Sequence, residues 1–281
     1  MRFAYFAAHH IQWNFSRGNA MDLNLRGRSA LVTGASRGIG AATAEVLAEE
    51  GCALHLAARN VSALEGLASR LRAVYGVDVR THPVDLWQQA DLAALTDAAS
   101  DIDILVNNAG DIPGGTIEMV DEETWRHAWE LKVFGYINLT RLVYARMKAR
   151  RHGVIVNNIG NAGERVDGQY IAGNTGNAAL MAFTGALGGR SLADGIRVVG
   201  VNPGPVATDR VLDFLKSRAH SQLGDEGRYS ELTSQYPLGR PATPREIADL
   251  IVFLASDRSG YTRGAVFTVD GGISATSPAL G

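Results

Sequence analysis

The segment Thr33-Gly34-Ala35-Ser36-Arg37-Gly38-Ile39-Gly40 decides the fold of this chain. It follows the short apolar run Ser29–Thr33 and leads into Ala41–Glu50, which is rich in helix formers and ends at Gly51. Glycines at this spacing permit a tight turn, a close approach of the backbone to a phosphate, and tight packing of helix on strand. The amino end of the helix then offers free N–H groups and partial positive charge. The segment therefore predicts a strand–loop–helix unit that binds a phosphate group.

Short apolar runs alternate with helical patterns along the rest of the chain. Helix ends are marked by Gly76, by Asp121 and by the capping-box pair Thr243 and Glu246. This order predicts a Rossmann-like, doubly wound α/β fold, in which a seven-stranded parallel sheet carries helices on both faces. The expected strands are Ser29–Thr33, Ala53–Ala58, Val77–Val84, Ile102–Val106, Val154–Asn157, Ile196–Val201 and Ala265–Thr268. The expected helices are Ala41–Glu50, Leu64–Tyr75, Asp91–Ala99, Asp121–Arg150, Asn174–Leu192 and Pro244–Ala255.

The pattern predicts one dinucleotide-binding domain over residues 21–281, because no Pro/Ser-rich linker or low-complexity tract divides it. Residues 1–20 show no clear period, and we expect them to form a mobile tail. Residues 211–235 are polar and charged, which favours a helical flap within a lid at about 208–240.

Charge and cysteine content narrow the function classes. The 27 basic and 29 acidic residues give a formal charge of −2, so nothing points to nucleic acid or an anionic membrane as a partner. Cys52 is the only cysteine, which excludes an internal disulfide, favours a reducing compartment such as the cytoplasm, and suggests a small core residue. No run reaches the roughly 18–20 apolar residues of a membrane helix. The apolar stretch Met1–Ala8 is interrupted too early for a signal peptide, and no metal site is expected.

Further motifs follow the later strands. Asn107-Asn108-Ala109-Gly110 follows the fourth strand, Pro203-Gly204-Pro205-Val206-Ala207-Thr208 the sixth and Asp270-Gly271-Gly272 the seventh, while Asp85 comes after the third. With the G-x-x-x-G-x-G spacing of residues 34–40, these segments resemble the short-chain dehydrogenase/reductase family. The resemblance runs from about residue 25 to residue 274, and four motifs in order make it specific.

The resemblance implies where a nicotinamide dinucleotide would bind. Asp85 and Leu86 would line the adenine, residues 108–110 the ribose, and Val206 and Thr208 would hold the nicotinamide carboxamide. The expected cofactor-binding residues are Gly34, Ser36, Arg37, Gly38, Ile39, Gly40, Arg59, Asp85, Leu86, Asn108, Ala109, Gly110, Pro203, Gly204, Val206 and Thr208.

Charge at the end of the second strand predicts which dinucleotide binds. NAD-binding folds place an acid there for the ribose hydroxyls, whereas this chain reads Ala57-Ala58-Arg59-Asn60. Arg59, together with Arg37 and Ser36 of the glycine loop, would attract a 2′-phosphate, and each charge-assisted bond is worth about 1.5–3 kcal/mol. The alternative is two solvated surface arginines. We expect NADP(H) to bind in preference to NAD(H).

The chain departs from the family at the usual catalytic positions. Family members generally use an Asn on the long helix, a Ser, a Tyr, and a Lys four residues after that Tyr. Asn177-Ala178-Ala179-Leu180 aligns with the family's Lys-Ala-Ala-Leu, which puts Asn177 at the Lys position and Gly173 at the Tyr position. Counting thirteen residues back from Gly173 gives Gly160 at the Ser position, and counting seven on from the tryptophan at 125 gives Lys132 at the helical Asn position.

Two interpretations of these positions compete. In the first, the chemistry is relocated: the Asn and Lys types have exchanged places, Tyr170 supplies a phenol, and Asn161 stands in as a carbonyl donor. The candidate catalytic residues are then Lys132, Tyr170, Asn177 and Asn161. In the second, only binding remains, with Lys132 a helix-face charge and Tyr170 a packed or surface aromatic. The reciprocal exchange favours a site that still functions, but a general acid also needs the right geometry, which the sequence does not show.

The leading functional hypothesis is an NADP-dependent oxidoreductase that acts on a small carbonyl or alcohol through a non-standard active site. The alternatives are a catalytically silent NADP(H)-binding sensor or partner subunit, and a non-redox, lyase-like enzyme, because fold does not fix function. The resemblance further implies a homodimer or homotetramer assembled through the long helices at residues 121–150 and 174–192. The expected partners are therefore a small-molecule substrate and further copies of the chain.

Overall fold

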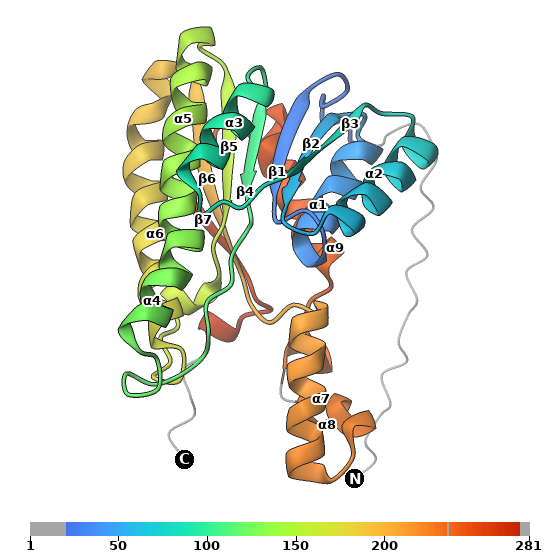
Figure 1. Cartoon of the computed structure of the whole chain (residues 1–281), viewed down its shortest axis with the longest axis vertical. Helices are drawn as coiled ribbons and strands as arrows, with labels where there is room; N and C mark the ends of the chain where they lie inside the picture. Colours follow the sequence, from blue (N-terminus) through green and yellow to red (C-terminus); the bar gives the residue numbers. More distant parts are fainter. Residues whose placement is uncertain (1–20, 235, 276–281) are drawn as a thin grey trace, which may run out of the picture.

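A parallel sheet of seven strands forms the centre of the molecule (Figure 1). The computed structural model describes residues 21–234 and 236–275, and its strands lie in the order β3-β2-β1-β4-β5-β6-β7. They span Ser29–Thr33 (β1), Ala53–Ala58 (β2), Val79–Pro83 (β3), Ile104–Asn107 (β4), Gly153–Asn158 (β5), Ile196–Pro203 (β6) and Val266–Val269 (β7). Because the order reverses between β1 and β4, the loops that leave these strands diverge and open a crevice at the carboxyl edge. The expected doubly wound α/β fold is confirmed.

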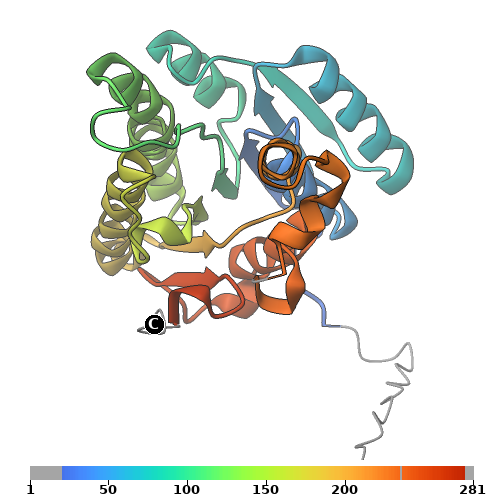
Figure 2. The same cartoon turned by 90° about the horizontal axis from the view of Figure 1, so that it is seen from below.

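Two layers of helices cover the sheet (Figures 1 and 2). One face packs against α1, α2 and α9, and the other against α3, α5 and α6. Strands buried on both faces are nearly all apolar, which explains why they read as apolar runs rather than as alternating patterns. The helices span Gly38–Glu49 (α1), Val61–Tyr75 (α2), Gln89–Ala98 (α3), Glu122–Trp129 (α4), Gly135–Arg150 (α5), Ile171–Ser191 (α6), Asp209–Leu223 (α7), Tyr229–Leu232 (α8) and Pro244–Ala255 (α9).

The helix ends that the sequence marked are present. Asp121 accepts a hydrogen bond from the backbone N–H of Thr124 at 2.7 Å and so caps α4. Thr243 and Glu246 form a reciprocal capping box at the start of α9. Gly76 ends α2 with φ of 69°, a left-handed conformation that glycine adopts without strain.

The long helix expected over residues 121–150 is interrupted. Between α4 and α5 the chain forms one π-helical turn, Glu130–Phe134, with Lys132 at its centre. Lys132 and, one turn later, Tyr136 donate hydrogen bonds to the carbonyls of Ile159 and Asn158, at the end of β5. Single π turns inside α-helices occur often at functional sites. This one turns the lysine side chain toward the carboxyl edge of the sheet.

A helical flap follows β6. The helices α7 and α8 stand below the sheet in Figure 1, so the flap expected over residues 211–235 is indeed helical where it is described. Its role as a lid over the crevice stays a prediction. The tail expected at residues 1–20 lies outside the described residues. Across the described part of the chain, none of the helices is long and apolar enough to cross a membrane.

Candidate active site

The glycine loop between β1 and α1 is built by close backbone contacts. Gly34 and Gly38 have φ of +63° and +57°, so both need the left-handed conformation that favours glycine. A Cβ on Gly40 would overlap the carbonyl oxygen of Gly34, which keeps this position free of any side chain. The amino end of α1 therefore presents bare backbone to the crevice, as binding of a pyrophosphate requires.

The segment after β4 is locked onto this loop. The hydroxyl of Thr33 accepts hydrogen bonds from the backbone N–H groups of Asn108 and Ala109, at 2.9 and 3.1 Å. The Asn108 side chain donates back to the carbonyl of Thr33 at 3.0 Å. A Cβ on Gly34 would lie only 2.9 Å from the Cα of Ala109. The two motifs, 74 residues apart, thus form one rigid wall of the crevice.

The segment after β6 closes the crevice from the opposite side. A Cβ on Gly38 would lie 3.0 Å from Cγ2 of Thr208, so the threonine rests against the glycine loop. Val206 is buried, and the neighbouring residue 207 donates its backbone N–H to the carbonyl of Ala242 at 2.7 Å. Gly204 donates to the carbonyl of Val269 at 3.0 Å, which ties this segment and the preceding Pro203 to β7. The segments that the resemblance assigned to the cofactor therefore converge.

The end of the crevice where the adenosine is expected carries two exposed arginines, Arg37 and Arg59, with Ser36 partly buried beside the first. Within the part of the chain that the structure describes, neither guanidinium pairs with a carboxylate. Leu86 is buried, and one carboxylate oxygen of Asp85 accepts from a backbone N–H two residues on, at 3.2 Å. Ile39, partly buried, packs against the core under the loop. This end can offer unpaired positive charge to an anion.

Two asparagines leave buried acceptors at the crevice. The Oδ1 atoms of Asn158 and Asn177 are buried and have no hydrogen-bond partner among the described residues. Asn158 donates through Nδ2 to Oδ1 of Asn108 at 2.8 Å, so it stands beside the wall described above. A buried acceptor without a partner is unfavourable, by about 1–3 kcal/mol, unless a ligand satisfies it. Together with the bare glycine loop, these acceptors fit a dinucleotide whose ribose hydroxyls donate hydrogen bonds.

Lys132 crosses the crevice. A Cβ on Gly110 would lie 2.8 Å from its Cδ and 3.2 Å from its Cγ, so the aliphatic stem lies directly against this glycine. Its ammonium donates to the carbonyl of Ile159 at 2.5 Å, immediately before Gly160. The lysine therefore reaches from the long helix to the end of β5.

Tyr170 and Asn177 each lie against a glycine as well. A Cβ on Gly173 would overlap the ring of Tyr170, and a Cβ on Gly160 would lie 2.9 Å from Nδ2 of Asn177. Gly160 has φ of +130°, which also favours glycine. Lys132 and Asn177 thus both lie at the end of β5. The Tyr170 ring lies at the start of α6, where it packs against a cluster that contains Ile112 and Ala172.

Asn161, the fourth candidate, is directed elsewhere. Its Nδ2 donates to Asp270 at 3.2 Å and to the hydroxyl of Ser274 at 3.4 Å. Burial acts to raise the pKa of Asp270, but hydrogen bonds from Ser274 and Asn161 hold that pKa below its ordinary value. Asn161 therefore fastens the loop after β5 to the turn after β7, and its role as a carbonyl donor stays a prediction.

Two residues at this site were missed in the sequence, Trp87 and Asn158. Asn158 had a signal: Asn107-Asn108 and Asn157-Asn158 end neighbouring strands in register, so their side chains can pair across the sheet. Trp87 had none beyond its place two residues after Asp85, because its contacts come from segments remote in sequence.

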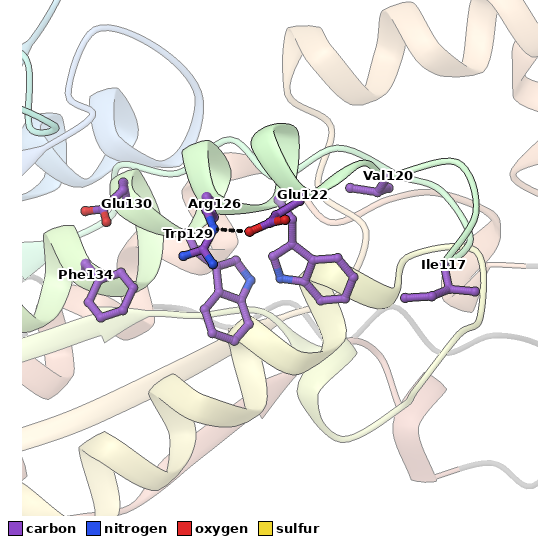
Figure 3. Close-up of a pocket in the computed structure, with 8 residues that line it drawn as sticks. Ile117, Val120, Glu122, Arg126, Trp129, Glu130 and Phe134 are labelled. Atoms are coloured by element: carbon purple, nitrogen blue, oxygen red, sulfur yellow. Dashed lines mark hydrogen bonds and ion pairs between the residues drawn. The ribbon is translucent and has the colours of Figure 1, made fainter.

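A second concave region lies on the outer surface of α4, away from the glycine loop. Figure 3 shows the Trp129 indole and the Phe134 ring among the side chains that line it, together with the ion pair of 2.8 Å between Glu122 and Arg126. Its volume is about 540 Å³. The described residues contain no cluster of His, Cys, Asp and Glu able to hold a metal ion.

Known proteins resemble this chain over most of its length. A family model described as Enoyl-(Acyl carrier protein) reductase matches residues 34–274. A 3-oxoacyl-(acyl-carrier-protein) reductase of Vibrio cholerae is 35% identical over 260 residues, covering 89% of this chain and 99% of the relative. A 2-keto-3-deoxy-L-fuconate dehydrogenase of Xanthomonas campestris is 31% identical, covering 88% and 80%.

Solved structures agree with these relatives. L-sorbose reductase from Gluconobacter frateurii, crystallised with NADPH and L-sorbose, superposes with a TM-score of 0.86 at 34% identity, covering 92% of this chain and 100% of that one. A structure described as a short chain dehydrogenase/reductase family protein superposes with a TM-score of 0.79 at 33% identity, covering 91% and 100%. With the fold, the glycine loop and the interlocking motifs, these matches show that the chain belongs to the short-chain dehydrogenase/reductase family of oxidoreductases.

Proposed function

We propose that this protein is an NADP(H)-dependent oxidoreductase that acts on a small carbonyl or alcohol through a relocated active site. The unpaired arginines Arg37 and Arg59 and the absence of an acid in residues 57–60 support NADP(H). The sorbose reductase structure, with its NADPH and small ketose sugar, supports both the cofactor and the size of substrate. Glycine-loop N–H groups would hold the pyrophosphate, and Asn158 and Asn177 would accept from ribose hydroxyls.

One observation carries the proposal. The three candidate catalytic side chains Lys132, Tyr170 and Asn177 each lie against a glycine, in space that a side chain at that glycine would otherwise fill. Lys132 lies against Gly110, and Tyr170 and Asn177 occupy the positions that side chains at 173 and 160 would take. On the alignment given above, 160 and 173 are where family members carry Ser and Tyr. Each of these spaces is filled by a side chain that carries a polar group, so polar groups remain where the alignment places the family's own.

The chemistry follows from this placement. A bound nicotinamide would exchange hydride with the carbonyl carbon of the substrate. Lys132 supplies the positive charge at the end of β5, where negative charge develops on the carbonyl oxygen during reduction. Tyr170 would supply a phenol as proton donor, and an ammonium within reach of that phenol would favour its ionised form. Asn177 keeps a polar amide beside Gly160, in place of a hydroxyl.

A second candidate function is binding of NADP(H) without catalysis. It is favoured by one contact: Lys132 donates to the carbonyl of Ile159, just after β5, as the fully buried Tyr136 donates to that of Asn158, so both anchor the long helix. In that case the lysine would serve the fold, and the protein would act as a sensor or a partner subunit.

Kinetics distinguish the two functions. NADPH binding would be measured by nicotinamide fluorescence, and turnover on a panel of ketoses, 2-oxo acids and 3-oxoacyl thioesters, for wild type, Lys132→Met, Tyr170→Phe and the double variant. The relocated site predicts losses in turnover that are strongly non-additive, with NADPH affinity retained. The exposed Lys148, on the same long helix, gives the control Lys148→Met. NADPH binding without turnover of any substrate, or wild-type turnover in Lys132→Met, would contradict relocated catalysis.

We further propose a homodimer or homotetramer, in which the second concave region, on α4, lies in a contact between copies. The exposed side chains of Phe134 and Ile117 and the small-residue character of α6 support this assembly. Light scattering at micromolar concentration tests it, and a strict monomer would contradict it. Burial raises the pKa of the Cys52 thiol to about 12, which makes it unreactive, and a cytoplasmic location stays a prediction.

A further inference from the structure

Three side chains gather where β2 and β3 end. The guanidinium carbon of Arg59 lies 4.8 Å from the centroid of the Trp87 ring, and the rings of Trp87 and His127 lie 3.9 Å apart between centroids. Arg59 comes from the turn after β2, Trp87 from the turn after β3, and His127 from α4. The cluster therefore exists only because the fold brings three remote segments together at the adenosine end of the crevice.

Trp87 is held both at its backbone and at its ring. Its own backbone N–H donates to the Asp85 carboxylate at 3.2 Å, which fixes the turn, while His127 packs against the ring. Asp85 is fixed in turn, because its backbone N–H donates to Asp91 at 2.9 Å. The indole Nε1 is buried and has no hydrogen-bond partner among the described residues. The ring is thus a fixed platform rather than a mobile surface side chain.

The contact with the Trp87 ring favours binding of an anion by Arg59. Arginine loses considerable rotamer freedom when it binds a ligand, so a guanidinium that already rests on an aromatic face binds at a smaller entropic penalty. The next residue, Asn60, caps the 15-residue helix α2 by accepting from the N–H of Ala63 at 3.0 Å. The guanidinium therefore stays beside a helix amino end, where the field also favours an anion.

We propose that Trp87 is a positioning residue for the 2′-phosphate: its ring holds the Arg59 guanidinium in place and so sets the preference for NADP(H) over NAD(H). Arg59 makes the contact with phosphate, and Trp87 acts through it. The inference rests on the proposed NADP(H) site but concerns only its adenosine end, so it can be tested without substrate or turnover.

The test uses two fragments that differ only in the 2′-phosphate, adenosine 2′,5′-bisphosphate and 5′-AMP, titrated calorimetrically into the full chain. Trp87→Ala is expected to weaken the bisphosphate about threefold to tenfold and to change 5′-AMP by less than about twofold. Trp87→Phe keeps an aromatic face and should retain most of the preference. The double variant with Arg59→Ala should bind the bisphosphate no more weakly than Arg59→Ala alone, because Trp87 acts through that arginine.

Trp125→Ala is the matched control, because Trp125 lies on α4 as His127 does but contacts Trp129, away from Arg59. It should leave both affinities unchanged. An equal loss of both fragments in Trp87→Ala would assign the ring a merely structural role, and an unchanged preference would also overturn the inference. If wild type itself failed to prefer the bisphosphate, the proposed NADP(H) preference would fail too, which separates the two outcomes.

Discussion

The two ends of the crevice are built by different means. At the glycine-loop end, backbone packs against backbone: Gly34 and Gly40 admit no Cβ, and Thr33 bonds directly to the segment after β4. At the other end, side chains pack into space that glycines leave, as Lys132 does against Gly110 and Tyr170 against Gly173. Backbone-built sites tolerate almost no change, whereas a side-chain-built site can exchange residues between neighbouring helices while the pocket keeps its polar groups. On the alignment proposed here for residues 160, 173 and 177, this difference would account for cofactor motifs that are kept while the catalytic positions change.

The largest effect is expected from a methyl group in the backbone-built end. In Gly40→Ala, the new Cβ overlaps the carbonyl oxygen of Gly34, so the loop must open. We expect loss of measurable NADPH binding, monitored by nicotinamide fluorescence, and a lower melting temperature, measured by calorimetry. Gly66→Ala is the control: it lies inside α2 with nothing within 4 Å of its Cβ, so it should be neutral or stabilise by up to about 1 kcal/mol. Full NADPH affinity in Gly40→Ala would show that the loop is not the binding site.

The parts that the sequence predicted well are those with local causes. The bounds of β1 and β2 were predicted to the residue, and Asp121 caps its helix through its own neighbours. The π turn at 130–134 and the contact of Arg59 with Trp87 were not predicted, because each depends on a partner segment at least 25 residues away. Asn161 shows the same limit: its residue type suited a carbonyl donor, but only the fold reveals Asp270 beside it.

A methyl group in the side-chain-built end should reduce turnover rather than binding. In Gly173→Ala the new Cβ overlaps the Tyr170 ring, which must swing away. If Tyr170 donates the proton, kcat/KM should fall about a hundredfold, within the usual range for general acid catalysis, while NADPH affinity holds. Gly189→Ala, on the same helix with nothing within 4 Å of its Cβ, gains the same helix propensity without the overlap. Equal activity in the two variants would remove Tyr170 from the mechanism.

Lowering the pH is expected to have an intermediate effect on folding stability, through two histidines at the edge of the backbone-built half. His55 on β2 and His82 on β3 stack at 5.0 Å and share a hydrogen bond of 2.9 Å. Burial, with the charges of His55 and Arg80, lowers the pKa of His82 to about 4; burial and Arg80 also lower the pKa of His55, which Asp101 and Asp78 partly offset. Because the folded pKa lies below the unfolded value of about 6.5, the stabilisation is complete above pH 6.5 and is lost as pH falls toward 4.

Urea unfolding at pH 7 and at pH 4.5 measures this loss. Wild type should lose about 2 kcal/mol more stability between these pH values than His82→Gln, which keeps a hydrogen-bonding side chain without the titration. Both proteins share every other titrating group, including His55, so the difference isolates the titration of His82. Parallel pH dependence in the two proteins would show that the pKa of His82 does not change on unfolding.

The smallest effect separates two asparagines one turn apart on α6. Asn174 and Asn177 are both buried, and each has an Oδ1 without a partner among the described residues, but only Asn177 lies against Gly160 at the crevice. Asn174 donates instead to the backbone of Asp167 at 2.6 Å, which holds the loop before the helix. Asn174→Ala should therefore cost about 1 kcal/mol of stability and leave NADPH affinity unchanged. Asn177→Ala removes an acceptor that the fold leaves unsatisfied, so stability should hardly change, while NADPH affinity should fall about threefold to tenfold if the ribose hydroxyls satisfy that oxygen. Chemical denaturation and fluorescence titration of both variants test the pair. A loss of stability without a loss of affinity in Asn177→Ala would make this residue part of the fold alone and leave Asn158 as the proposed ribose contact.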